Sequence, residues 1–161
     1  MPSFDIVSNI DLQEVENAIQ SVKKEIAQRY DFKASAASID RKAAEITIIA
    51  DDDYKLDAIH EMLKVHITRR KIDVKALDFE KPQRASGNTL RQVVNIKHGI
   101  DSETAKKISK EIKGQKFKAQ TSIRGEELRV EAKKKDDLQE VMTFVRNLKI
   151  ELPLQFNNFR D

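Results

Sequence analysis

Residues 45–63 read EITIIADDDYKLDAIHEML, and residues 127–145 read ELRVEAKKKDDLQEVMTFV. Both segments begin with a strand-like alternation and continue with apolar residues at spacings of three and four, the period of an amphipathic helix. Their apolar positions coincide without a gap: Ala50, Leu56, Ile59, Met62 and Leu63 correspond to Ala132, Leu138, Val141, Phe144 and Val145. The sequence therefore predicts a strand followed by a helix, present twice in the chain.

The repeat extends on the N-terminal side of these segments. Ile10-Asp11 and Ile100-Asp101 each begin a helical pattern, and Phe32-Lys33-Ala34 and Phe117-Lys118-Ala119 each begin a strand-like stretch. The offset between the two copies falls from 90 to 85 to 82 residues along the chain. A duplication in which the second copy has lost residues at two places accounts for this pattern.

Each copy predicts the order strand, helix, strand, strand, helix, strand. The first has strands at 4–8, 32–39, 45–51 and 74–79, a turn at 40–44, and helices that follow Asp11 and Asp53. The second has strands at 90–97, 117–123, 127–133 and 154–159, with helices at 101–113 and 136–148. Two helices cover one face of a four-stranded antiparallel sheet and leave the other face open. The fold class is α+β, a tandem duplication of two ferredoxin-like (βαββαβ, RNP-like) domains over residues 1–85 and 86–161.

The order of the strands also predicts an exchange between the domains. Strands 74–79 and 90–97 are consecutive, and consecutive strands pair about two-thirds of the time. If they pair, strand 90–97 takes the place of the first strand in the first domain. Strand 3–8 then fills the vacant place beside 154–159 in the second domain. The spatial domains would be about 10–98 and 1–9 plus 99–161.

Composition limits the classes of protein that need to be considered. The chain has 161 residues, of which 39% are hydrophobic and 35% charged, and it has no cysteine, which excludes disulfides and thiolate chemistry. No apolar run approaches the roughly 18 residues of a membrane span, and the N-terminus does not read as a signal peptide. We expect a cytoplasmic protein without a membrane partner.

Charge is distributed unevenly along the chain. Residues 1–85 hold 14 Lys and Arg against 16 Asp and Glu, whereas residues 86–161 hold 16 against 11. A basic second half is typical of proteins that bind phosphate or nucleic acid, and it also occurs where lysines serve only solubility.

Several blocks of the sequence resemble one bacterial family over the whole length of the chain. They are Pro2-Ser3-Phe4-Asp5-Ile6-Val7-Ser8, Asp11-Leu12-Gln13-Glu14-Val15, Arg29-Tyr30-Asp31-Phe32, Lys97-His98-Gly99-Ile100-Asp101, Asp136-Asp137-Leu138-Gln139 and the C-terminal Gln155-Phe156-Asn157-Asn158-Phe159-Arg160-Asp161. Together they are similar to the YajQ family. The resemblance implies a cytoplasmic protein of two RNP-like domains that binds nucleotides, with nucleic acid (including tRNA) and cyclic di-GMP as ligands of members. It supplies no catalytic activity and no agreed binding residues.

The open face of the second sheet provides the first candidate site. Alternation along strands 117–123 and 127–133 sends four cations to that face: Lys118, Arg124, Arg129 and Lys133. Such a face can hold phosphate and sugar groups, and it can equally be an ordinary solvated surface. The corresponding face of the first domain, with Lys33, Ser35, Thr47, Ile49 and Asp51, is less basic. Neither strand 45–50 nor strand 128–133 has the aromatic residues on which RNA-recognition modules stack bases.

A second candidate lies at the turn that precedes helix 101–113. Free amides at a helix start attract phosphate, Gly99 permits a close approach, and His98 and Lys106 are nearby in sequence. Asp101, however, is placed to cap the helix and to repel an anion, so a purely structural turn is the alternative.

The remaining motifs favour neither an enzyme nor a metal site. Asp51-Asp52-Asp53 lacks the glycine and the distal glutamate of a calcium loop, and no nucleophile, dinucleotide or Walker-type motif is present. We expect no cofactor. The preferred function is non-catalytic binding of nucleotides (ATP or GTP) or of RNA, including tRNA, by the second domain. The alternatives are a cyclic di-GMP-responsive regulator with a protein or DNA partner and, with least support, a small-molecule enzyme.

Overall fold

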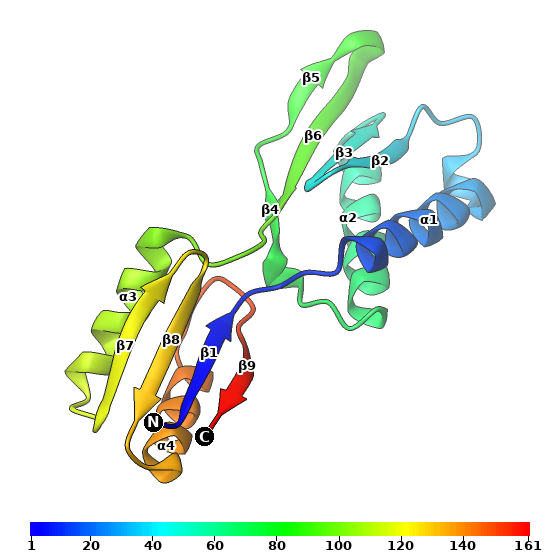
Figure 1. Ribbon diagram of the computed structural model, residues 1–161. Helices are drawn as coiled ribbons and strands as arrows, with labels where there is room; N and C mark the ends of the chain where they lie inside the picture. Colours follow the sequence, from blue (N-terminus) through cyan, green and yellow to red (C-terminus); the bar gives the residue numbers. More distant parts are fainter. The chain divides into compact units, whose positions relative to one another are not determined.

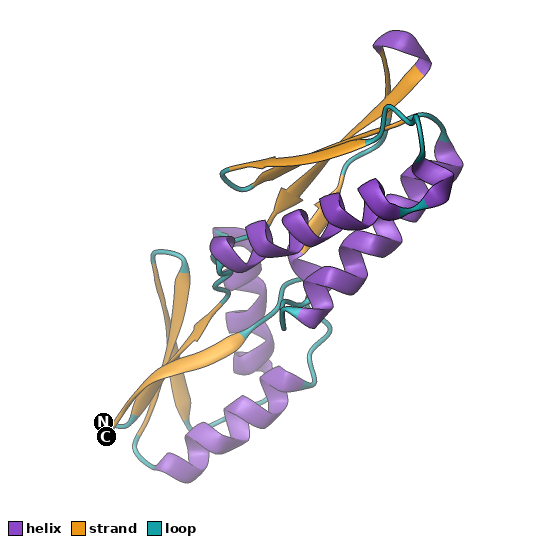
Figure 2. Ribbon diagram, turned by 90° about the vertical axis from the view of Figure 1, so that its right-hand side faces the viewer, coloured by secondary structure: helices purple, strands orange, loops and turns teal.

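The computed structural model describes residues 1–161 and contains two compact units. We call residues 10–97 the first unit, and residues 1–9 together with 98–161 the second unit. In each unit the helices cover one face of an antiparallel sheet (Figures 1 and 2). No helix has the length and apolar character needed to cross a membrane.

The first unit has two helices and a sheet in the order β2-β3-β6-β4, with β5 pairing beside β4 on the same edge of β6. Asp11 caps α1 through the amides of Gln13 and Glu14, and Asp52, rather than the expected Asp53, caps α2 through the amide of Lys55. The elements are α1 (Leu12–Gln28), η1 (Tyr30–Phe32), β2 (Ser38–Lys42), β3 (Glu45–Ala50), α2 (Asp53–Arg69), η2 (Val74–Ala76), β4 (Leu77–Phe79), β5 (Gln83–Ala85), η3 (Ser86–Asn88) and β6 (Thr89–Ile96).

The second unit has the sheet order β7-β8-β1-β9 and two covering helices. Buried residues of β1, β8, α3 and α4 form its core, and the Ser109 hydroxyl of α3 lies 2.6 Å from that of Thr121 on β7. The elements are β1 (Ser3–Val7), α3 (Ser102–Gly114), β7 (Ala119–Arg124), β8 (Glu127–Ala132), α4 (Lys135–Arg146) and β9 (Gln155–Arg160).

The strand pairing confirms the tandem α+β fold and the exchange of first strands. β6 lies between β3 and β4, with Val94 opposite Ile46 and Phe79. β1 lies between β8 and β9, with Ile6 opposite Leu128 and Phe156. Each sheet is therefore completed by a strand that the sequence repeat assigns to the other copy.

A buried carboxylate holds β1 in the second sheet. Asp5 is 3% exposed, and it accepts hydrogen bonds from Arg129 Nε of β8 at 3.0 Å and from Asn158 Nδ2 of β9 at 2.8 Å. Burial tends to raise the pKa of Asp5, but these hydrogen bonds and the charges of Arg129 and Arg160 outweigh it and hold the pKa below its usual value. One side chain thus links the three strands β8, β1 and β9.

The second strand of the first unit differs from the prediction. Residues 32–39 were expected to form it, but Phe32 ends the 3₁₀ turn η1 and the strand is β2, Ser38–Lys42. Ala34 has a φ of +61°, a left-handed conformation that interrupts an extended chain. Because β2 begins only at Ser38, Lys33 and Ser35 lie outside the sheet. Because β2 ends at Lys42 and β3 begins at Glu45, the turn between them consists of Ala43 and Ala44 instead of the predicted 40–44.

The segment between the two repeats is also more regular than expected. The boundary between the repeats is predicted between residues 85 and 86, but Gln83–Ala85 form β5 and pair with β6 through Arg91, Leu90 and Thr89. The turn Ser86–Asn88 closes a hairpin, with Gly87 at a φ of +71°. The β7 strand likewise begins at Ala119 rather than 117.

The exchange predicts which fragments fold. A fragment of residues 10–97 holds the complete first sheet and should unfold cooperatively in urea, with a slope of at least about 1 kcal/mol per molar. A fragment of residues 1–85, the sequence repeat, lacks β6 and should show no cooperative transition. Circular dichroism during urea titration of both fragments and the full chain measures this. Cooperative unfolding of 1–85 would contradict the exchanged pairing.

The Asp5 network predicts a pH-dependent contribution to stability. Because the folded pKa of Asp5 is lowered, the stabilisation is present above the unfolded value of about 3.9 and is lost as the pH falls through the folded pKa. Asp5→Asn should lower the free energy of unfolding by about 1–3 kcal/mol at pH 7, and the difference from the wild type should shrink below about pH 4. Asp40→Asn, at an exposed surface pair with Lys23, is the control and should cost less than about 0.5 kcal/mol. A deficit that is constant with pH would contradict this role.

Candidate functional site

The predicted basic face of the second sheet carries charges of both signs. The alternation is as expected, since Leu128, Val130 and Ala132 point into the core. On the opposite face, however, Arg129 is engaged by Asp5, and this hydrogen bond raises the pKa of the arginine. Glu127 and Glu131 stand on the same strand and face as Arg129. The face therefore does not carry four free cations, because Arg129 is paired with Asp5.

The other three predicted cations lie at opposite ends of β7 and β8. Arg124 is at the hairpin turn, opposite Glu127. Lys118 and Lys133 lie at the far end, next to the pair formed by Ala119 and Ala132. Six residues at about 3.3 Å each separate Lys118 from Arg124 by roughly 20 Å. One small ligand cannot contact both ends, whereas Lys118 and Lys133 are neighbours.

A groove gathers this pair of lysines with a third one. It has a volume of about 550 Å³ and is lined by Met1, Lys118, Ala119, Gln120, Glu131, Ala132, Lys133, Lys134 and Asp137. The three lysines are exposed and make no ion pair, while Glu131 and Asp137 are half-buried. The groove has the size of a small-ligand pocket, with three ammonium groups against two carboxylates.

The start of helix α4 forms part of the same groove. Its N-cap residue is Lys134, whose side chain makes no capping hydrogen bond, in contrast to the aspartates that cap the other three α-helices. The first amides of α4 therefore have no side-chain acceptor and carry the positive end of the helix dipole. Sequence reasoning missed Lys134, although the run Lys133-Lys134-Lys135 before a helix without an acidic or hydroxyl cap was a usable signal.

The turn before α3 is occupied by the protein itself. The Gly99 amide donates to the Ser8 carbonyl at 2.7 Å, and the Glu126 side chain fills the space where a Cβ of residue 99 would lie. Asp101 caps α3 through the Thr104 amide, and a hydrogen bond from the Thr104 side chain is the main cause of the lowered pKa of Asp101. Gly99 thus has no free amide for phosphate, and Lys106 lies exposed on α3, one turn further along the helix.

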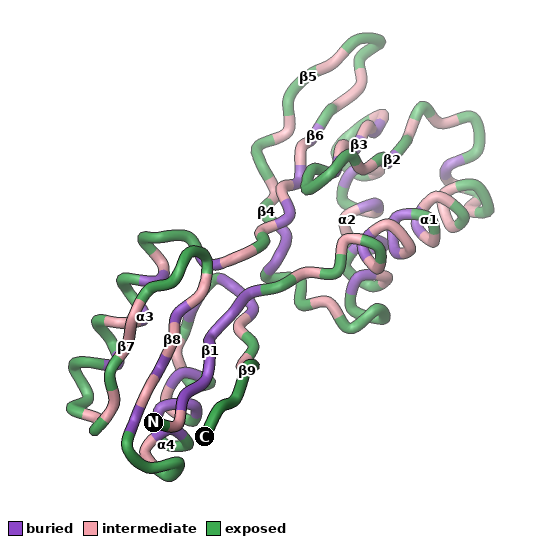
Figure 3. The backbone as a smooth tube through the Cα atoms, viewed as in Figure 1, coloured by how far each residue is buried: buried purple, intermediate pink, exposed green.

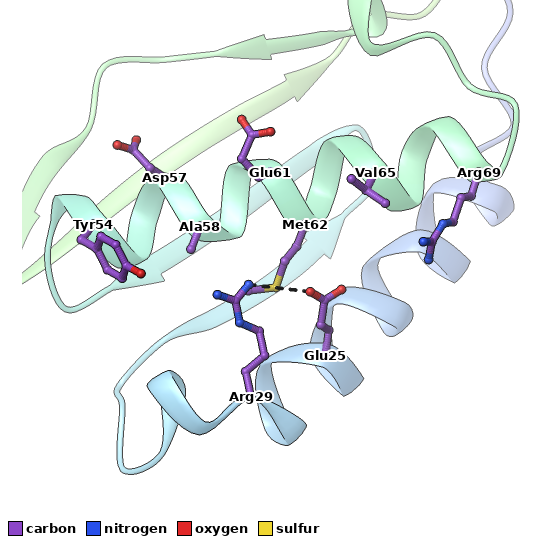
Figure 4. Close-up of a pocket in the computed structure, with 9 residues that line it drawn as sticks. All are labelled: Glu25, Arg29, Tyr54, Asp57, Ala58, Glu61, Met62, Val65 and Arg69. Atoms are coloured by element: carbon purple, nitrogen blue, oxygen red, sulfur yellow. Dashed lines mark ion pairs between the residues drawn. The ribbon is translucent and has the colours of Figure 1, made fainter.

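A second cavity, of about 500 Å³, lies between the two helices of the first unit (Figure 4). Its lining has three carboxylates, from Glu25, Asp57 and Glu61, against two arginines. One of these, Arg29, is 3.7 Å from Glu25 and 2.9 Å from Asp31. This balance of charge disfavours phosphate, so the groove of the second unit is the better candidate.

The Asp51-Asp52-Asp53 run has structural roles. Asp51 accepts hydrogen bonds from the Ser35 hydroxyl and the Ala36 amide, and its pKa is lowered chiefly by the bond from Ser35. Asp52 caps α2. Two of the three carboxylates are therefore accounted for by local backbone and side-chain contacts.

Comparison with known proteins places the chain in a family. Residues 2–160 match the family model described as nucleotide-binding protein YajQ-like. Curated nucleotide-binding proteins from Paramagnetospirillum magneticum, Parvibaculum lavamentivorans and Magnetococcus marinus are 55%, 53% and 53% identical over 161 residues, covering 100% of both chains in each case. Since the match spans nearly the whole sequence at this identity, the chain belongs to the YajQ-like family.

Proposed function

We propose that this chain binds nucleotides or RNA through their phosphate groups, in the groove of the second unit, and catalyses no reaction. The observation that carries the proposal is the grouping of Lys118, Lys133 and Lys134 with the uncapped start of α4 in one groove. The relatives are named for nucleotide binding and not for a reaction, which supports a binding role. Nucleotides, RNA and tRNA are cytoplasmic, and we place the protein there.

The groove suits phosphate better than bases. Lysine ammonium groups and helix amides contact phosphate oxygens without regard to sequence. The apolar lining consists of Met1, Ala119 and Ala132, which offers contact to a ribose or a base but no aromatic ring for stacking. Half-buried Glu131 and Asp137 can accept hydrogen bonds from ribose hydroxyls or base amino groups.

A direct comparison of ligands distinguishes the proposed function from the alternative, a regulator that responds to cyclic di-GMP. Labelled ATP, GTP, cyclic di-GMP and tRNA are titrated against one preparation at two salt concentrations. RNA held by several lysines should weaken steeply with salt, whereas a single small nucleotide should respond modestly. Tight binding of cyclic di-GMP with little affinity for tRNA would favour the regulator with a protein or DNA partner.

Removal of the groove lysines should weaken binding of RNA. The triple variant K118Q/K133Q/K134Q removes up to three lysine–phosphate ion pairs, each worth roughly fivefold at 0.1 M salt for a single strand. The affinity for a single-stranded RNA should fall at least about tenfold, and the slope of log affinity against log salt should decrease by about 0.7 for each phosphate that is no longer neutralised. Fluorescence anisotropy with a labelled 20-nucleotide RNA measures both quantities.

The matched control is K107Q/K110Q/K149Q, which removes three exposed lysines of the same unit that lie outside the groove. Its affinity for the single-stranded RNA should fall by less than about threefold, because charges beyond a Debye length of about 10 Å are largely screened. Neither variant should change the free energy of unfolding by more than about 0.5 kcal/mol. Equal losses of RNA affinity in the two variants would show that the groove is not the binding site.

The open sheet faces predict weak sequence discrimination. Phe4 on β1 is fully buried, and the outward residues of β8 are Glu127, Arg129 and Glu131. The central strands β3 and β6 of the first unit carry no aromatic residue at all. With no exposed aromatic ring on the central strands, affinities for unrelated 20-nucleotide single strands should agree within about a hundredfold in competition anisotropy. A larger preference would show that base edges are read elsewhere.

A further inference from the structure

The longest acid-free stretch of the chain, residues 81–100, lies almost entirely in the first unit, whereas the groove belongs to the second. Between Glu80 and Asp101, twenty residues contain no Asp or Glu and include four cations: Lys81, Arg84, Arg91 and Lys97. A run of this length is unusual in a chain with 27 acidic residues among 161. The structure shows that the first part of the run is the β5–β6 hairpin (Figure 1).

The hairpin presents its end to solvent. The turn Ser86–Asn88 is exposed (Figure 3), and nothing lies within 4 Å of a Cβ built on Gly87. β5 pairs with only the first three residues of β6, so from Gln83 to the turn the two strands extend for about 10 Å. The end of the hairpin is narrow, free of carboxylates and built from small polar residues.

Two cations of the hairpin, and a third that lies just before it, are available for a ligand. Lys81, Arg84 and Arg91 are exposed, and none of them makes an ion pair. Arg84 stands opposite Leu90, whereas Arg91 is one residue further along β6, so the two arginines project from opposite faces of the ribbon.

The acidic residues closest in the strand pairing do not neutralise these cations. Glu80 precedes the hairpin, and its carboxylate accepts from Asn95 Nδ2 at 2.5 Å. The Asp51–Asp53 run follows β3. β3 pairs with one edge of β6, and β5 pairs with the opposite edge. Within that run Asp51 lies 3.2 Å from Lys55, and Asp52 caps α2.

From these observations we propose that the β5–β6 hairpin is a binding element for double-stranded DNA and enters its major groove. That groove is about 12 Å wide and admits a two-stranded ribbon. The free edge of β5 is the edge that enters, because β3 pairs with Leu90 and Arg91 on the other edge of β6. A ribbon with side chains on both faces is about 10 Å thick, the spacing of stacked sheets. Arg84 and Arg91 then meet phosphates on opposite walls of the groove, and their guanidinium groups can bind phosphate oxygens in pairs.

The hairpin is a second site, independent of the groove. It lies in the first unit, and the groove lies in the second. The proposal extends the proposed function to a further class of nucleic acid, and it does not require that the groove bind anything. The two are tested by different variants and different probes.

The test measures binding of the full-length chain to a labelled 20-base-pair DNA duplex by fluorescence anisotropy at two salt concentrations. K81Q/R84Q/R91Q should lose at least about tenfold in affinity, and the slope of log affinity against log salt should fall by about 0.9 for each phosphate that is no longer neutralised. The matched control K24Q/R69Q/K75Q removes three exposed cations of the same unit, none of them in an ion pair, and should lose less than about threefold.

Two further measurements separate folding and the groove from the hairpin. R84K/R91K keeps both charges and should retain most of the salt slope, while circular dichroism and urea unfolding show that each variant is folded. The hairpin variant should bind ATP as the wild type does, and K118Q/K133Q/K134Q should bind the duplex within about threefold of the wild type. The proposal is overturned if the wild type does not bind the duplex, or if the hairpin variant loses no more affinity than its control.

Discussion

The pairing of β1 with β8 and β9 is the constraint on which the second unit depends. β1 is buried on both faces, with Phe4 and Ile6 fully inside the core and Asp5 fixed by Arg129 and Asn158. Burial of each apolar side chain is worth about 1.5–3 kcal/mol, so these two alone approach the lower end of the stability of a typical domain. Because β6 has the equivalent place in the first unit, the sheet of each unit is complete only with a strand that lies across the repeat boundary.

The exchange also changes the distribution of charge. Along the sequence, the second half is strongly basic, but the exchange assigns Arg91 and Lys97 to the first unit and Asp5 to the second. The first unit then holds 16 Lys and Arg against 15 Asp and Glu, and the second holds 14 against 12. Net charge no longer distinguishes the units. The features that favour anion binding are therefore local groups of unpaired cations, in the groove and on the hairpin.

Sequence patterns predicted the fold well because the apolar period and the strand order are local properties. They failed at Phe32, which is buried in either conformation, so its apolar character could not reveal that Ala34 turns the chain away from a strand. They also failed at Arg129, whose partner Asp5 is 124 residues away and meets it only through the exchanged register. Lys118 and Lys133 were predicted together because they flank a single hairpin, whereas Arg124, at its other end, follows the same alternation without being near them.

The two candidate surfaces differ in a way that bears on their ligands. In the groove, Glu131 and Asp137 stand among the lysines, so a ligand must satisfy carboxylates as well as ammonium groups, which suits a nucleotide with hydroxyl and amino donors beside its phosphates. The hairpin offers cations alone on a narrow protruding ribbon, and its end has no pocket to enclose a small molecule. Such an element gains affinity only from a polyanion that surrounds it, since each exposed ion pair contributes little by itself. Under the two proposals, the groove of the second unit therefore holds individual phosphate groups of a nucleotide or an RNA strand, and the hairpin of the first unit contacts the two backbones of a duplex.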